Sequence, residues 1–171
     1  GGFFYNGIIT EFPANAVRRS KQTTAETGGY GKLARDWGDS LVMQGTLFWA
    51  CSTNTWDAVI NPTTDVAYFQ TAANKNRIAN PMLRAIGRYP AKHPKLDPRP
   101  AFRTGNPTLD AGYVISPPND GFYSSVNYIG AFAPNNLWID GWTALSKMGI
   151  ATKLVTVSPA TCTDMTQTEY T

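Results

Sequence analysis

The chain has 171 residues, of which 42% are apolar and 16% are charged, and its formal net charge is +3. This length and apolar content favour one domain with its own core, and no apolar run approaches the roughly 18 residues needed to cross a membrane. The single histidine excludes a metal site built on two histidines, and the absence of a CxxC motif argues against structural zinc. The chain begins Gly1-Gly2, so we expect a processed fragment that a further N-terminal part precedes.

Two apolar runs predict strands in the first third of the chain. They cover residues 3–12 (FFYNGIITEF) and 41–51 (LVMQGTLFWAC). With an offset of 38 residues, Asn6 falls opposite Gln44, which predicts that the two runs lie on adjacent parallel strands, about 4.8 Å apart. Residues 18–39 between them are polar and Gly-rich, and predict an excursion away from the strands.

Two stretches further along predict helices. Residues 63–78 begin with threonine and aspartate, which cap helices well, and continue with an apolar stripe at helical spacing. Residues 140–148 begin with Asp140 as the cap and place apolar side chains on one face, with a glycine after them.

The stretch 96–112 (LDPRPAFRTGNPTLDAG) predicts a rigid, hydrogen-bonded segment that is not helical. Its three prolines lack backbone donors, and Asp97 and Asp110 are short acceptors for the free N–H groups of irregular backbone. Residues 126–132 (VNYIGAF) then alternate and predict a short strand. Beyond residue 150 the chain is threonine-rich, and we expect this tail to be either a linker or a strand that reaches another subunit. Its β-prone run consists of Leu154, Val155, Thr156 and Val157.

Three pieces of the sequence together resemble one family. They are D-P-R-P at 97–100 with N-P-T-L-D-A-G at 106–112, then Y-I-G-A-F at 128–132, and G-W-T-A-L at 141–145. This pattern resembles the C-terminal part of secreted bacterial right-handed parallel β-helix proteins, in a mostly uncharacterised branch. The resemblance spans roughly residues 3–150. It implies an all-β fold, in which the terminal coils of a right-handed parallel β-helix are closed by an irregular Pro-rich cap with short helices, and residues 151–171 form an extended tail.

A strongly basic stretch lies between residues 75 and 103, where eight cationic side chains face one aspartate, Asp97. Such a stretch indicates an anionic partner, or else a solvated face whose arginines tie down irregular backbone. We expect Arg99 to be structural. The candidates for binding an anion or a partner are Arg84, Arg88, Lys92 and Lys95.

No complete catalytic set can be assembled from this sequence. His93 stands between lysines in a Lys-His-Pro-Lys sequence and is expected to lie in an exposed loop. Most of the aspartates stand in turn sequences, where a carboxylate satisfies backbone donors. We therefore predict no catalytic, cofactor-binding or metal-binding residue. A Ca²⁺ site among the acidic residues is the alternative, because they offer hard oxygen ligands. They are Glu11, Asp57, Asp97, Asp110, Asp120 and Asp140.

The cysteines and tryptophans carry further expectations. Cys51 and Cys162 are candidates for a disulfide, which would close a loop of about 110 residues, and two separate buried thiols are the alternative. Trp37 is the best candidate for an exposed aromatic. Trp49, Trp138 and Trp142 have apolar neighbours and are expected to pack in the core and the cap.

These observations favour a non-catalytic structural module at the cell surface or outside the cell, such as a fibre subunit joined by strand exchange through its tail. The expected partners are other protein chains, either copies of this chain or its N-terminal part, and polysaccharide is a further candidate. Nucleic acid is not expected, because the basic stretch holds too few aromatic side chains for base stacking. The alternative is a carbohydrate-active β-helix protein, a polysaccharide lyase or hydrolase or a glycan-binding module, whose active wall lies mainly outside this chain.

Overall fold

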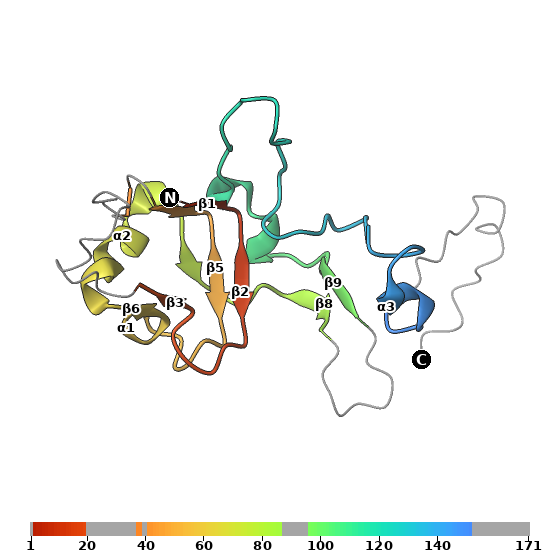
Figure 1. Cartoon of the computed structure of the whole chain (residues 1–171), viewed down its shortest axis with the longest axis horizontal. Helices are drawn as coiled ribbons and strands as arrows, with labels where there is room; N and C mark the ends of the chain where they lie inside the picture. Colours follow the sequence, from red (N-terminus) through yellow and green to blue (C-terminus); the bar gives the residue numbers. More distant parts are fainter. Residues whose placement is uncertain (1, 20–36, 39–40, 87–95, 152–171) are drawn as a thin grey trace, which may run out of the picture.

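The computed structural model describes residues 2–19, 37–38, 41–86 and 96–151, and these form short strands, short helices and long irregular connections (Figure 1). The strands are β1 (Gly2–Tyr5), β2 (Ile8–Thr10), β3 (Val17–Arg18), β4 (Leu41–Gln44), β5 (Leu47–Trp49), β6 (Ile60–Asn61), β7 (Arg77–Ile78), β8 (Leu83–Ala85) and β9 (Asp97–Pro100). The α-helices are α1 (Trp56–Val59), α2 (Val66–Gln70) and α3 (Ala144–Lys147). The 3-10 turns are η1 (Thr63–Asp65), η2 (Ala72–Asn74), η3 (Pro107–Leu109) and η4 (Ala111–Tyr113).

The first six strands form three parallel pairs, in which each of the first three strands pairs with the strand three places later in the chain. β1 pairs with β4, β2 with β5 and β3 with β6, and β7 adds to the other side of β5. The prediction that the two apolar runs lie on adjacent parallel strands is therefore confirmed. The predicted register is wrong by one residue, because Tyr5 and not Asn6 lies opposite Gln44.

The corners of the chain explain this register. An offset of 39 residues, as from Tyr5 to Gln44, aligns Asn6 with Gly45, and both have left-handed backbone with φ of +53° and +64°. The same offset aligns Glu11 with Ala50, which have φ of +64° and +52°. Strands that turn at the same places stay in hydrogen-bonding range on both sides of each turn. Backbone conformation, rather than the matching Asn-Gly and Gln-Gly pairs, thus fixes the alignment.

The main core lies where β5 and β6 face α1 and α2 (Figure 1). Phe48, Val59, Ile60 and Phe69 from these four elements are fully buried. Burial of a phenylalanine side chain contributes roughly 2–3 kcal/mol, so this small cluster is the main apolar contribution in the N-terminal body.

Both predicted helices are much shorter than expected. Residues 63–78 divide into η1, α2, η2 and β7, because Thr71 is extended and Lys75 is left-handed with φ of +53°. The second helix covers only Ala144–Lys147, and Thr143 rather than Asp140 accepts the capping hydrogen bond, from the N–H of Ser146. Asp140 instead accepts a hydrogen bond from the Ser146 hydroxyl at 2.7 Å.

In the closing segment 96–112 the predicted hydrogen bonds of the two aspartates are confirmed, whereas the prediction that no part is helical is wrong, because η3 and the start of η4 lie in it. Asp97 lies in β9, where its carboxylate accepts the backbone N–H of Arg99 and a bidentate pair of hydrogen bonds from the same guanidinium, at 2.6 and 2.7 Å. Asp110 accepts the N–H of Gly112 at 3.1 Å. The predicted strand at 126–132 is wrong, since these residues are irregular.

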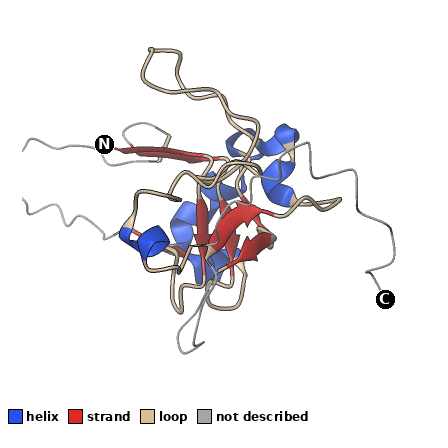
Figure 2. Ribbon diagram, turned by 90° about the vertical axis from the view of Figure 1, so that its right-hand side faces the viewer, coloured by secondary structure: helices blue, strands red, loops and turns tan. Residues whose placement is uncertain are grey.

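The predicted fold class, an all-β set of terminal coils of a right-handed parallel β-helix, is wrong. The strands form four small separate sheets, one of them the antiparallel pair β8–β9, and helices lie among them with no closed solenoid in the part of the chain that the structure describes (Figure 2). The physical reason is that, among the strands in the described ranges, only β5 has a neighbouring strand on both sides. After β7 the chain leaves the parallel strands, so the structure is a small mixed α/β fold.

Candidate assembly surface

A groove runs between β1 and the loop of residues 116–128, which projects past β1 in Figures 1 and 2. Its volume is about 390 Å³. Aromatic and small residues line it, and none of them carries a formal charge. They are Phe3, Phe4, Tyr5, Asn6, Gly7, Pro117, Tyr123, Ser124, Val126 and Gly130.

Large apolar side chains are exposed along this groove. Phe3 is 57% exposed and Phe4 is 53% exposed, although both belong to a strand. Tyr123 faces them from the loop and contacts the ring of Tyr5 edge-on, with centroids 6.5 Å apart. Exposed aromatic side chains gathered in one place mark interaction surfaces, because water contact with them is unfavourable.

The backbone of β1 is paired on one side. Its described neighbour is β4, and no second strand pairs with it among the residues that the structure describes. Asn6 donates its N–H toward β4, to the carbonyl of Gln44 at 2.9 Å. Because peptide groups point alternately to the two sides of a strand, those of Phe3 and Tyr5 point away from β4. They offer a second strand a place to pair.

The outer side of β4 is closed by side chains. The N–H of Met43 donates to the hydroxyl of Tyr68 at 3.0 Å, and its carbonyl accepts from the amide of Asn76 at 2.9 Å. These contacts occupy the groups that a further strand would need. The two-stranded sheet β1–β4 therefore has one open side and one closed side.

Asn6 fixes the loop that forms the other wall of the groove. Its side chain donates to the carbonyl of Ile115 and accepts the N–H of the same residue, both at 2.8 Å. At the far end of the loop, Gly130 donates its N–H to the Asn6 carbonyl at 2.8 Å, and Ile129 donates to Thr108 at 2.8 Å. The loop is thus held at both ends, so the groove is preformed.

The described members of the basic stretch mostly fix the backbone. Arg84 donates to the carbonyl of Pro134 at 2.8 Å and lies 3.7 Å from the carboxylate of Asp97. Arg77 donates to the carbonyl of Pro107 at 2.7 Å, and its guanidinium stacks 3.4 Å from the ring centroid of Tyr113. These contacts give Arg77 and Arg84 structural partners, and anion binding by Arg84 stays a prediction.

Arg99 is structural, as predicted. Burial would raise the pKa of Asp97, but the hydrogen bonds and charge of Arg99 outweigh it and hold that pKa below its ordinary value of 3.8. Both side chains are less than a tenth exposed. Both residues belong to β9, so the pair fixes the backbone and side chains within this one strand.

Several predicted site residues lie outside the described residues. Cys51 is a free and fully buried thiol, and because Cys162 is not described, their bond stays a prediction. The remaining anion-site candidates and the proposed assembly strand also lie outside the described ranges. They are Arg88, Lys92, Lys95, Leu154, Val155, Thr156 and Val157.

The prediction that Trp37 is exposed is wrong, and Trp49 is partly buried. Trp37 is half-buried against the core, stacks on Tyr68 and donates its indole N–H to Asp65 at 2.9 Å. Trp138 and Trp142 are exposed, by 47% and 65%, and stack on one another near α3.

The predicted strand at residues 3–12 gave no indication of the groove. Phe3, Phe4 and Tyr5 are consecutive aromatics, so at least one of them must point to each face of the strand. That breach of alternation was the available signal. Tyr123 could not be assigned to the groove, because its contact with Tyr5 depends on a loop of unknown path.

Three further findings bear on the site. Within the described ranges, no helix is long and apolar enough to cross a membrane, and no three His, Cys, Asp or Glu side chains gather as metal ligands. No family model, no curated protein and no solved structure matches this chain.

Proposed function

We propose that this chain is a non-catalytic structural module of an extracellular or cell-surface assembly, and that it binds another protein chain by accepting a strand along β1. The observation that carries the proposal is the combination of a strand side that no described residue pairs with and an uncharged, aromatic groove beside it. In strand addition, main-chain hydrogen bonds supply affinity and alternate side chains fill the adjoining pocket. Both requirements are met along β1.

The chemistry of the groove favours an apolar strand over other ligands. An anionic polymer would need cationic partners, and the lining residues carry none. A metal or a catalysed substrate would need titratable groups other than tyrosine, and the groove presents none among its lining residues. An extended segment with valine or leucine at alternate positions meets aromatic rings and unpaired peptide groups together.

We propose that the accepted strand is Leu154–Val157 of another copy of this chain. The run is uncharged and β-prone, which suits the groove. It begins three residues after Ala151, whose N–H donates to the carbonyl of Leu145 in α3, and α3 and β1 are well separated along the long axis (Figure 1). A donor that follows α3 and an acceptor at β1 of another copy make a head-to-tail contact, which builds chains rather than closed dimers.

The decisive experiment blocks the two partners separately and measures assembly by sedimentation velocity. Phe3→Pro removes a backbone N–H that points away from β4. Val155→Pro removes a backbone N–H from the proposed donor strand. Each substitution is expected to convert assembled material to monomer. Phe4→Ser provides a second test of the groove, because it removes an aromatic wall without changing the backbone.

The control is Met148→Ser, which removes a side chain that is 72% exposed and does not line the groove. It should assemble like the unmodified chain, and circular dichroism should show all four variants folded. Assembly that persists in folded Phe3→Pro and Phe4→Ser variants would refute the proposed site. An unmodified chain that remains monomeric at high concentration would refute it as well.

A further inference from the structure

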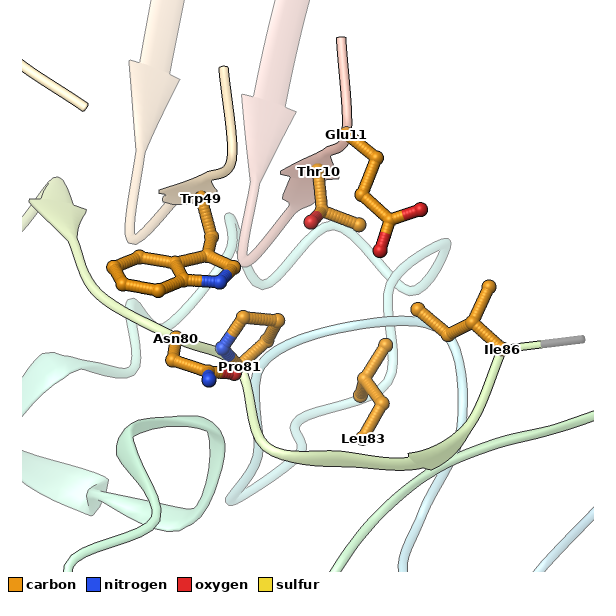
Figure 3. A pocket seen from close by; sticks show the side chains of 7 residues that line it. All are labelled: Thr10, Glu11, Trp49, Asn80, Pro81, Leu83 and Ile86. Atoms are coloured by element: carbon orange, nitrogen blue, oxygen red, sulfur yellow. The ribbon is translucent and has the colours of Figure 1, made fainter. Parts of the chain in front are cut away.

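A second pocket, of about 240 Å³, lies at the other end of β2 and β5 (Figure 3). Thr10, Glu11 and Trp49 form its upper wall where these two strands end, and the segment 80–86 forms the lower wall. It shares no lining residue with the groove along β1. A ligand here would therefore leave the β1 edge open.

Turns in three backbone segments shape this pocket. Glu11 and Ala50 are left-handed and carry the chain away from the strand ends, while the N–H of Glu11 still donates to the carbonyl of Trp49 at 2.9 Å. Met82 is also left-handed, with φ of +44°, and its N–H donates to the side-chain oxygen of Asn80 at 2.9 Å. Such conformations are costly for residues other than glycine, so surrounding contacts must hold them.

The side chains around the opening are of two kinds. Figure 3 shows the Trp49 ring above Asn80 and Pro81 on one side, and Glu11 above Leu83 and Ile86 on the other. Thr10 lies between Trp49 and Glu11. An aromatic face thus adjoins a hydroxyl, a carboxylate and an amide within one small space. Because Met82 already uses the Asn80 oxygen, the Asn80 amide can offer a ligand its N–H donors.

The size and chemistry of the pocket restrict its ligand. Its volume is below the range of about 300–1,000 Å³ found for drug-sized ligands, which leaves room for one small ring. A sugar ring presents hydroxyls that both donate and accept, and C–H groups on its flat faces that pack on an aromatic ring. The carboxylate of Glu11 would repel an acidic sugar at close range. We infer that this pocket binds one unit of a neutral saccharide.

The test uses the full chain and three soluble probes: cellobiose, N,N′-diacetylchitobiose and digalacturonate. Saturation-transfer NMR should detect contact with at least one of the two neutral disaccharides and little with digalacturonate. Asn80→Asp keeps the oxygen that accepts from Met82 but replaces the N–H donors, so binding should weaken by about tenfold or more without loss of thermal stability. Thr10→Val removes the hydroxyl from a strand position that tolerates valine, and should also weaken binding.

The matched control is Asn136→Asp, the same substitution at an exposed position outside the pocket, which should bind like the unmodified chain. The inference is overturned if neither neutral disaccharide binds, if digalacturonate binds equally well, or if folded Asn80→Asp and Thr10→Val variants bind normally. The readout does not depend on assembly, so a negative result here leaves the strand-addition proposal unaffected.

Discussion

Asparagine side chains do the work of backbone partners in this molecule. Asn6 bonds to both the N–H and the carbonyl of Ile115, and Asn76 accepts the N–H of Thr46 while it donates to the carbonyl of Met43. A primary amide has one acceptor and a donor in nearly the same plane, as a peptide group does. In a chain with short strands, these amides therefore connect backbone segments that no ladder reaches.

The buried pair of Asp97 and Arg99 is the residue-scale feature with the clearest energetic consequence. The pKa of Asp97 is lowered, so its carboxylate stays ionised in the folded chain at a pH where the unfolded chain binds a proton. The resulting stabilisation is complete above the ordinary pKa of 3.8 and is lost as the pH falls through the lower, folded value. The chain should thus lose stability in acid below about pH 4.

Asp97→Asn is expected to lower the free energy of unfolding by about 3–5 kcal/mol at pH 7, because it leaves the guanidinium of Arg99 buried without its counter-charge. The difference from the unmodified chain should shrink as the pH falls below 3.8, because the unfolded form of the unmodified chain then binds a proton at Asp97 while the folded form does not, until the pH reaches the lower, folded pKa. Urea unfolding at several pH values measures both effects. Asp57→Asn, at an exposed position on α1, is the control and should cost little. A constant difference across this pH range would contradict the assignment.

At the scale of elements, the strands were predictable and their register was not. The apolar runs that contain Phe3 and Leu47 signalled strands through composition alone. The register depends on which residues adopt left-handed backbone, and Asn6, Glu11 and Ala50 do so without being glycine. Sequence patterns predict such conformations at glycine and much less at other residues, which explains an alignment that was wrong by one.

The predicted helix at residues 63–78 was too long for a related reason. Periodic apolar residues at 66, 69 and 72–73 predicted a helix that continues to Ile78. Asn74 bonds instead to Gln44 and to the carbonyl of Tyr68, and the chain turns into β7. Local hydrogen bonds from asparagine competed successfully with the helix, and the partners of those bonds lie 6 and 30 residues away.

Gly45 tests the importance of the corner. Gly45→Ala would place a Cβ 2.5 Å from the Asn6 side-chain oxygen, which holds Ile115, and 3.2 Å from the carbonyl of Tyr113. We expect a loss of roughly 2–4 kcal/mol in unfolding free energy, from left-handed strain plus the displaced hydrogen bond. Urea unfolding gives the value.

Gly105→Ala is the matched comparison, because Gly105 has a similar φ of +76° but nothing within 4 Å of its added Cβ. It should lose only the strain contribution, about 1–2 kcal/mol. Equal losses at the two positions would show that the contact with Asn6 is unimportant and that the corner does not hold the loop.

At the scale of the whole molecule, the predicted solenoid failed because three pairs of parallel strands do not make a closed wall. The first two pairs have three or four residues in each strand, but β3 and β6 have two. The chain then spends residues 63–74 on helical turns and, after β7, forms an antiparallel pair. Local sequence patterns could identify strands. They could not show that a third strand, β7, would pair beside β5 and not beside β4 or β6.

The candidate groove was also beyond the sequence, since its two walls come from residues 3–7 and 117–130. Only the first wall had a local signal, in its consecutive aromatics. The second wall depends on Asn6, which reaches a residue 109 positions away. No pattern within a short window contains that information.

Head-to-tail assembly predicts a specific behaviour in mixtures. Phe3→Pro chains keep a donor and lack an acceptor, while Val155→Pro chains keep an acceptor and lack a donor. Each should be monomeric alone, and a one-to-one mixture should form a heterodimer that grows no further. Sedimentation velocity distinguishes monomers, heterodimers and longer polymers. A dimer formed by either variant alone, or long polymers in the mixture, would contradict the head-to-tail arrangement.

Buried and exposed tryptophans contribute different parts of the fluorescence emission of this molecule. Trp37 and Trp56 pack around Phe69 in the N-terminal body, whereas Trp138 and Trp142 stand in water beside α3. Indoles in an apolar setting emit at shorter wavelength than indoles in water, and a dissolved quencher reaches the latter first. The two ends of the chain are therefore optically separable without any label. Loss of order around α3 can be followed in the same sample as the unfolding of the body, each by its own part of the emission band.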